Sequence, residues 1–326
     1  MDSSVMHRAV SLNIASATGQ AGLTFVEIAG FVRKAEEAGI DMVVISDATD
    51  ERSSSPFEAT TLLAALATVT ESIGLVASAS TLAHQPYNLA RRFASLDIIS
   101  RGRIGWNATM RQNPRDAVNF SRPGGIAEDD FRRRAEEFIG IVQSLWRGWD
   151  ADALLFDKDG GRYHDPEKMH LLDHKGEFFS VRGPLNVARS RQDTPVLVLS
   201  GLAEADLDFA ARVADAILLD EQSPEVANVA CDDLRRRARA AGRRPNAVKV
   251  LAAIPAGPEL TFERLDDWLA PQGCDGLTFA LPADLSAIDD FADRVLPELR
   301  RSGLARSAYG GATLRDHLGL GAGGAK

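Results

Sequence analysis

The stretch IGLVASASTLAHQPYNLARRFASLDIISRGRIGWNA, residues 73–108, decides the fold of this chain. It begins with an apolar run of strand length, 73–78, continues with a segment of helical period, 86–100, and ends in a second apolar run, 104–108. Pro86 suits the first turn of a helix, where its missing N–H is not needed. Both runs are continuous rather than alternating, which is typical of parallel strands buried on two faces. The stretch therefore predicts a β-α-β unit.

The same unit recurs along the rest of the chain. The expected strands are 9–14, 42–46, 73–78, 104–108, 195–199, 216–219, 248–254 and 276–280, and the expected helices are 24–38, 56–70, 86–100, 131–146, 204–213, 225–241, 262–270 and 288–301. Eight successive strand-then-helix units predict an α/β fold, the (β/α)8 TIM barrel, with a doubly wound sheet as the alternative. We expect one domain over residues 1–318 and a flexible tail over 319–326.

Two segments are longer than a barrel needs. Residues 109–130 follow the fourth strand directly, so they belong to the face where barrel enzymes place their sites, and we interpret them as a candidate active-site lid. Residues 148–194 lie between the fourth helix and the fifth strand and contain a hairpin-like stretch, 174–181. We interpret this second segment as a small β-excursion on the surface that covers the barrel.

Composition excludes several classes of protein. The 326 residues carry a formal net charge of −9 and are 45% hydrophobic, which indicates a globular chain with a substantial core and argues against a general nucleic-acid binder. No run is long enough to span a membrane, and the first residues lack a secretory signal. The two cysteines, Cys231 and Cys274, cannot form a metal site alone and are interpreted as a sign of a reducing compartment. We therefore expect a cytoplasmic protein without a metal.

Polar residues at the carboxyl ends of the strands are the candidate site, because the barrel interior beneath them is apolar. They are Asn13, Ser46, Asp47, residues 78–81, Trp106, Asn107, Ser200, Gly201 and Asp220. Asn107 stands out because an unpaired amide at the barrel mouth would cost free energy. The Ser200-Gly201 turn has backbone N–H groups that suit an anion. Asp47 either caps the next loop or accepts a hydrogen bond from a ligand.

Other polar residues favour simpler interpretations. His84 is expected to cap or pack, the histidines of the excursion (His164, His170, His174) to be solvated, and the arginine-rich part of helix 225–241 to face water. Arg111, Arg115 and Arg122 in the candidate lid either face water or meet an anionic substrate. No P-loop, dinucleotide-binding glycine motif, Gly-x-Ser-x-Gly elbow or His-Glu-x-x-His motif occurs in the sequence.

Several blocks resemble a known family. Residues 73–81, 86–97, 100–107, 182–187 (RGPLNV) and 313–320 (TLRDHLGL) are similar to the bacterial luciferase-like flavin monooxygenases, in the branch of the nitrilotriacetate, EDTA, dibenzothiophene-sulfone and dimethyl-sulfide monooxygenases. The resemblance implies a (β/α)8 barrel and a homo-oligomer. It also implies reduced FMN from a separate flavin reductase, which reacts with O2 to a C4a-(hydro)peroxide that oxygenates a small organic substrate.

The resemblance also assigns cofactor-binding positions. Asp47, Ser80, Thr81 and Asn107 match flavin-site positions of the family, and Ser200-Gly201 begins the turn expected at the flavin phosphate. The catalytic residues stay unknown.

The chain departs from the family pattern at the phosphate. The usual His-Asp-Glu-Arg-Tyr is replaced by residues 127–131, AEDDF, and the usual Gly-Ala-Ser-Glu-Ala-Gly by 201–206, GLAEAD. Three side-chain donors are thus missing, at Ala127, Phe131 and Ala203, unless Arg111, Arg115 or Arg122 replaces them. The acidic run 128–130 adds repulsion if it faces the pocket. We therefore expect weak FMN binding, not appreciably tighter than that of riboflavin.

The leading interpretation is the FMNH2-dependent monooxygenase component of a two-component system. Two alternatives stay open. The chain is either a flavin-poor or non-catalytic partner in a heteromeric luciferase-like pair, or an enzyme that uses a deazaflavin or no flavin.

Overall fold

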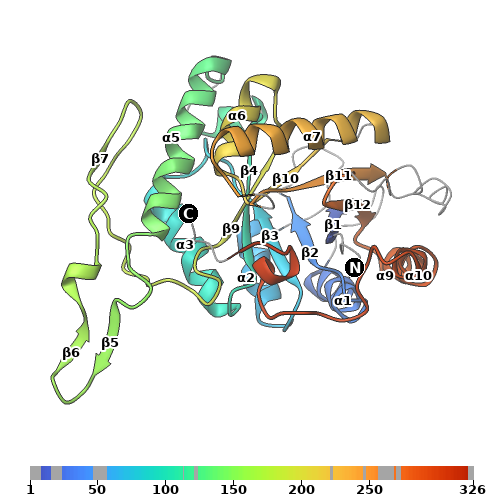
Figure 1. Ribbon diagram of the computed structural model, residues 1–326, viewed down its shortest axis with the longest axis horizontal. Helices are drawn as coiled ribbons and strands as arrows, with labels where there is room; N and C mark the ends of the chain where they lie inside the picture. The colour runs from blue at the N-terminus through green and yellow to red at the C-terminus, as the bar shows by residue number, and fades with distance from the viewer. Residues whose placement is uncertain are drawn as a thin grey trace.

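The computed structural model describes residues 9–15, 24–46, 57–112, 114–120, 124–220, 223–244, 247–255, 268 and 273–321. Its centre is a closed barrel of eight parallel strands in the order β1-β12-β11-β10-β9-β4-β3-β2 (Figure 1). The barrel strands are β1 (Ala9–Ala15), β2 (Met42–Ile45), β3 (Gly74–Ser78), β4 (Ile104–Thr109), β9 (Val196–Ser200), β10 (Ala216–Leu218), β11 (Lys249–Pro255) and β12 (Gly276–Pro282). Because the sheet closes through the β1–β12 pair, the predicted TIM barrel is confirmed and the doubly wound sheet is excluded.

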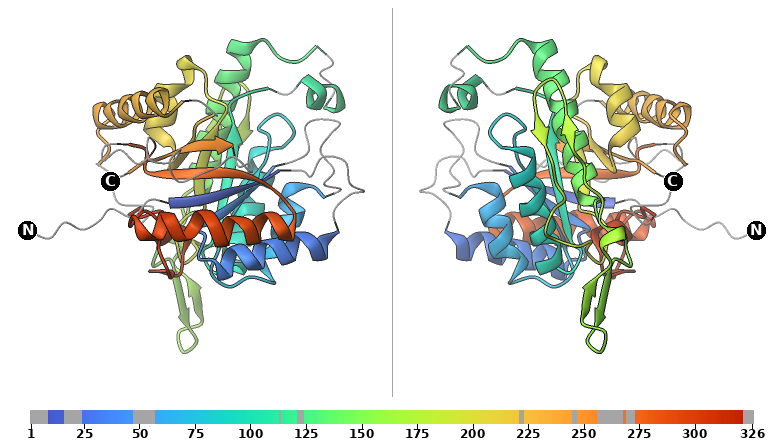
Figure 2. Two further views of the ribbon diagram at one scale, coloured as in Figure 1. Left: turned by 90° about the vertical axis from the view of Figure 1, so that its right-hand side faces the viewer. Right: turned by 90° about the vertical axis from the view of Figure 1, so that its left-hand side faces the viewer.

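Helices surround the barrel, as Figures 1 and 2 show. They are α1 (Phe25–Glu37), α2 (Ala59–Ala67), α3 (Pro86–Ile99), α4 (Pro114–Asn119), α5 (Glu128–Trp146), α6 (Leu207–Val213), α7 (Pro224–Ala240), α9 (Leu285–Asp290), α10 (Leu296–Arg301) and α11 (Leu314–His317), with short turns η2 (Glu204–Asp206) and η4 (Phe291–Val295). The expected helix 262–270 lies outside the described residues, apart from Trp268. The expected helix 288–301 is interrupted by the π-helical turn η4, which divides it into α9 and α10.

Apolar side chains form two main layers of core. One cluster fills the floor of the barrel with residues such as Met42, Val76 and Val198, which alternate along the strands with residues of the outer layer. The outer cluster lies between the strands and the helices, where α1 contributes Phe31 and Val32 among other residues. The polar groups at the strand carboxyl ends are therefore held on a closely packed frame.

The excursion between α5 and β9 consists of two hairpins. β5 (Leu154–Asp157) pairs with β6 (Arg162–His164), and β7 (His174–Lys175) pairs with β8 (Ser180–Val181), which confirms the expected hairpin. The β7–β8 hairpin packs on α5, where the Glu137 carboxylate accepts hydrogen bonds from the backbone of Phe178 and Phe179.

The expectation that the whole excursion covers the barrel is wrong. The β5–β6 hairpin projects away from it in Figures 1 and 2, and the Phe156 and Tyr163 rings near its tip are 62% and 61% exposed. Those two rings stack edge-on against each other, with 5.4 Å between their centroids. The hairpin is thus held together by contacts between its own strands.

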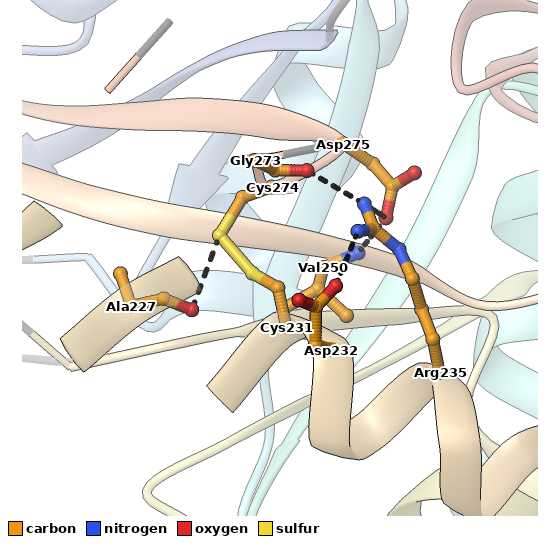
Figure 3. The surroundings of a disulfide bond; sticks show 8 residues. All are labelled: Ala227, Cys231, Asp232, Arg235, Val250, Gly273, Cys274 and Asp275. Atoms are coloured by element: carbon orange, nitrogen blue, oxygen red, sulfur yellow. Dashed lines mark hydrogen bonds and ion pairs between the residues drawn. A yellow bond between two sulfur atoms is a disulfide. The ribbon is translucent and has the colours of Figure 1, made fainter. Parts of the chain in front are cut away.

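The two cysteines form a disulfide, which sequence analysis did not anticipate (Figure 3). Cys231 lies on α7 and Cys274 lies just before β12, so the bond joins an outer helix to the start of a barrel strand. Arg235, one turn further along α7, donates to the carbonyl of Gly273 at 2.8 Å beside it. The disulfide between the two cysteines removes the basis for interpreting them as a sign of a reducing compartment.

The arginines of α7 are not a purely solvated face. Arg237 donates to the carboxylates of Glu204, Asp208 and Asp233 at 2.6 to 2.8 Å, and the bonds to Asp233 and Asp208 raise its pKa. Acidic partners on two neighbouring elements explain the difference from the expectation. Separately, no helix in the described ranges is long and apolar enough to cross a membrane.

Candidate functional site

The carboxyl ends of β2, β3 and β4 bring three polar side chains together. The Asn107 Nδ2 group donates to the Ser78 hydroxyl at 2.8 Å, and the Ser78 hydroxyl lies 3.0 Å from that of Ser46. Strand register explains the contact, because Ser78 is paired with Asn107 across β3 and β4. Of the predicted site residues, Asn107 is thus joined to a small polar row at the barrel mouth. Asp47, which follows Ser46 in the chain, lies outside the described residues.

The Asn107 amide keeps an unused acceptor. Its side chain is 5% exposed, and its Oδ1 has no hydrogen-bond partner within the described part of the chain. Unsatisfied buried acceptors are uncommon in folded proteins and call for an explanation. A ligand N–H or O–H placed at the barrel mouth would satisfy this oxygen, so the ring of a flavin fits this end of the site.

Ser80 and Thr81 play different roles in the turn after β3. The Ser80 hydroxyl accepts from the Leu82 backbone N–H at 3.1 Å, and its carbonyl lies 3.0 Å from Nδ1 of His84. Ser80 and His84 therefore hold the turn itself, as expected for His84. Thr81 is 1% exposed, and its hydroxyl has no partner among the described residues. Thr81 is therefore the residue of this pair with unused hydrogen-bonding capacity.

A cavity of about 380 Å³ opens beside the neighbouring strands β4 and β9. Its walls come from the segment after β4, the first turns of α5 and the turn after β9. The lining residues are Met110, Arg111, Gln112, Glu128, Phe131, Arg132, Gly201, Leu202, Ala203 and Asp206. Of the predicted anion-binding turn, Gly201 lines the cavity. Gly201 has a φ of 65°, and a Cβ at this position would lie only 2.9 Å from the Thr109 hydroxyl. Only glycine therefore fits this turn.

The cavity contains Phe131 and Ala203, two of the three positions where the family's donors are missing. It also contains two residues that sequence analysis did not single out, Arg132 and Asp206. The Arg132 Nε donates to Asp206 at 2.8 Å, and this bond is the main cause of a raised arginine pKa. The two residues are 74 positions apart, so only the fold joins them. The sequence gives one hint of this ion pair: the basic residue Arg132 lies one turn after the acidic residues that begin α5.

The candidate lid is attached at its base. Gln112 donates to the Ile126 carbonyl at 2.8 Å and accepts from its N–H at 2.7 Å, which holds the two ends of the segment together. Arg111 lies in an exposed ion pair with Asp220, 2.8 Å between Nη2 and Oδ2, rather than facing only water. The side chains of Arg115 and Arg122 lie outside the described residues.

The chain matches the family model described as luciferase-like monooxygenase over residues 6–272. The N-acetyl-S-(2-succino)cysteine monooxygenase of Bacillus subtilis is 30% identical, with 96% of this chain and 94% of the relative covered. Component A of the nitrilotriacetate monooxygenase of Aminobacter aminovorans is 31% identical over 90% of this chain and 84% of its own length.

Solved structures agree with the fold. A riboflavin lyase with modified FMN and riboflavin has a TM-score of 0.82 at 27% identity, covering 97% of this chain and 96% of its own. The EDTA monooxygenase of Chelativorans sp. BNC1 has a TM-score of 0.84 at 23% identity, covering 97% and 99%, and supports the fold alone. The alignment with the Bacillus enzyme spans 414 positions, so that relative carries insertions which this chain of 326 residues lacks. The chain belongs to the luciferase-like monooxygenases, a family of flavin-dependent oxidoreductases.

Proposed function

We propose that the protein is the oxygenase component of a two-component system, which uses reduced FMN or a closely related flavin supplied by a separate flavin reductase. The name of the Aminobacter relative, component A, supports a system of more than one protein. The observation that carries the proposal is the buried Asn107 amide at the mouth, whose Oδ1 lacks a partner among the described residues. Reduced flavin supplies the electrons that activate O2, and the chain orients the ring and excludes water.

The residues at the mouth divide into two roles in this proposal. Asn107 accepts a hydrogen bond from the flavin ring, and Ser78 holds the amide in place through its 2.8 Å contact with Nδ2. The Thr81 hydroxyl is a second buried group of the mouth without a partner in the described part of the chain. Residues 109–130, attached through Gln112 and Ile126, cover the site as a lid, and residues 1–318 form one domain in this proposal.

Ring binding is tested with oxidised riboflavin, whose fluorescence is quenched on binding. Asn107→Leu removes the acceptor, and we expect riboflavin to bind at least fivefold more weakly, because a lost buried hydrogen bond costs about 1 to 3 kcal/mol. Ser95→Ala is the control, since this hydroxyl donates to the carbonyl of Arg91 within the outer helix α3. Equal riboflavin affinity in the Asn107→Leu variant and the wild type would reject Asn107 as a flavin ligand.

Turnover is tested with a flavin reductase, NADH and 18O2. Incorporation of one labelled oxygen atom into a small organic substrate, only when reduced flavin is supplied, is the expected result. The polycarboxylate and organosulfur compounds in the relatives' names give the first substrates to screen.

We also propose that the protein forms a homo-oligomer. Light scattering at micromolar concentration tests this, and a monomer under these conditions would contradict it.

Membership of a heteromeric pair is the second candidate. It is favoured by similarity to both chains of the pristinamycin IIA synthase of Streptomyces pristinaespiralis, at 40% identity to one chain over 59% of this protein and 30% to the other over 81%. Co-expression with a second luciferase-like chain from the same genome discriminates the two candidates. Activity that appears only in the mixed complex supports the heteromeric pair.

A further inference from the structure

The cavity beside β4 and β9 has a carboxylate, Asp206, among its lining residues. Asp206 is 3% exposed, and both of its oxygens are in use. Oδ2 accepts from the Ala203 backbone N–H at 2.7 Å, and Oδ1 accepts from the Arg132 Nε at 2.8 Å. A backbone N–H and a guanidinium that converge on one carboxylate are the kind of donors that hold a bound phosphate.

The other charges of the cavity leave no surplus positive charge. Arg132 also donates through Nη1 to Asp129 at 2.9 Å, and its Nη2 lies 3.9 Å from the Glu128 carboxylate. Arg111, the second arginine in the lining, is paired with Asp220. The lining residues therefore contribute two arginines against two carboxylates, Glu128 and Asp206. A phosphate dianion would have to displace Asp206 from a partly buried ion pair and would still meet these carboxylates, which is costly.

We propose that Asp206 is a built-in anion that determines the flavin specificity of this site: it occupies the Ala203 N–H and the Arg132 Nε, so that the site accepts the neutral ribityl end of a flavin and discriminates against its phosphate. This inference rests on the proposed use of a flavin. It also supplies a physical reason for weak FMN binding beyond the missing donors, because two donors that the cavity contains, the Ala203 N–H and the Arg132 Nε, are already satisfied by Asp206.

The test compares riboflavin with FMN, which differ only in the phosphate. Fluorescence quenching of each oxidised flavin gives two dissociation constants for the full chain. For the wild type we expect FMN to bind no tighter than riboflavin. In Asp206→Asn the side chain still accepts from Ala203, while the Nε of Arg132 loses the Asp206 carboxylate and keeps only the exposed Asp129 and Glu128 nearby. FMN should then bind at least tenfold tighter, with riboflavin unchanged within twofold.

Two further variants separate a specific effect from a change in net charge. Adding Arg132→Gln to Asp206→Asn should remove the gain in FMN affinity, because the guanidinium that Asp206 no longer occupies is then absent. Asp208→Asn is the matched control, since it also removes one negative charge, two residues further along, where the carboxylate pairs with Arg237 on the outer surface. It should leave the ratio of the two constants unchanged. Asp206→Ser, which keeps an acceptor for Ala203, replaces Asp206→Asn if that variant does not fold.

Each outcome of these binding measurements either supports or overturns the proposal. A wild type that prefers FMN to riboflavin tenfold or more overturns the proposal, and so does an Asp206→Asn variant with an unchanged ratio. If neither flavin binds the wild type at millimolar concentration, the proposed function fails, and inorganic phosphate alone then tests the cavity. Phosphate binding by Asp206→Asn but not by the wild type would still support the built-in anion, whereas equal behaviour of the two would reject it.

Discussion

Asp97 is a buried carboxylic acid far from the cavity just described. It lies at the end of α3, where Oδ1 accepts from the Ile104 N–H at 3.0 Å and from the Gln192 amide at 2.6 Å, and Oδ2 accepts from the Ser190 hydroxyl. These bonds join α3, the start of β4 and the segment that leads into β9. Burial outweighs the hydrogen bonds and raises the Asp97 pKa from 3.8 to about 6.

The raised pKa of Asp97 makes stability depend on pH. The folded state holds the proton more tightly than the unfolded chain, so the free energy of unfolding falls as the pH rises from about 4 to above 6. Asp97→Asn cannot ionise, and its amide can keep all three contacts by donating to Ser190. Between pH 5 and pH 7.5 the variant should therefore gain about 1 to 2 kcal/mol of unfolding free energy relative to the wild type. Urea unfolding at both pH values measures this gain.

The control for Asp97 is an exposed acid. Asp159→Asn, at the turn of the projecting hairpin, should follow the wild-type pH profile. Parallel profiles for Asp97→Asn and the wild type would show that Asp97 does not titrate in this range.

At the scale of single elements, the disulfide fixes α7 against the start of β12. The two cysteines are 43 residues apart, and closing a loop of that length in the unfolded chain is worth about 4 kcal/mol in the chain-entropy account. Cys231→Ala together with Cys274→Ala should lower the free energy of unfolding by about 2 to 4 kcal/mol. Urea unfolding of the double variant, compared with the wild type with and without reductant, measures the loss.

Burial predicts how this bond behaves toward reductants. Cys231 and Cys274 are 0% and 2% exposed, so a mild thiol should not reduce the bond in the folded protein but should do so in urea. Free thiols counted under both conditions check this. Two reactive thiols in the native protein would contradict the closed packing of α7 on β12.

The elements that sequence analysis located correctly are those with local signals. The β3 and α3 boundaries were predicted to within a residue, because a continuous apolar run and Pro86 mark them within the stretch itself. Ser78 and Asn107 were both placed at the carboxyl ends of strands, and the structure adds that their side chains are in contact. The orientation of the β5–β6 hairpin could not be predicted, because its local sequence pattern indicates strands and a turn but not how the hairpin is oriented relative to the barrel.

Contacts that depend on the fold as a whole were missed for the same reason. Cys231 and Cys274 lie in separate units, and their meeting depends on how α7 packs against β12. Asp206 and Arg132 likewise belong to different units of the barrel. A family pattern identifies where donors are missing, at Ala203 and Phe131. It does not identify a carboxylate, Asp206, that accepts hydrogen bonds from Ala203 and Arg132 in the same cavity.

At the scale of the whole molecule, the two ends of the barrel have different tasks. The segment after α10 crosses the end opposite to the candidate site, where Leu314 and Leu318 join the apolar cluster on the barrel floor. Arg315 forms two bonds with Asp215 at 2.8 and 3.1 Å and anchors this segment below the turn between α6 and β10. In TIM barrels the floor serves stability and the opposite face serves function.

Close packing at the floor leads to a prediction that separates the two ends. Leu314 is fully buried, and a Cβ placed on Gly74 would lie only 2.4 Å from its Cδ1, so the side chain has no space to spare. Leu314→Ala should lower the free energy of unfolding by about 2 to 5 kcal/mol through lost burial and a cavity. Leu285→Ala is the control, because Leu285 is 40% exposed and should cost much less. Urea unfolding measures both variants, and riboflavin affinity at 20 °C should stay within twofold of the wild type, since the mouth lies at the other end of a rigid frame. A large loss of flavin affinity in folded Leu314→Ala would instead mean that the floor and the mouth of the barrel are energetically coupled.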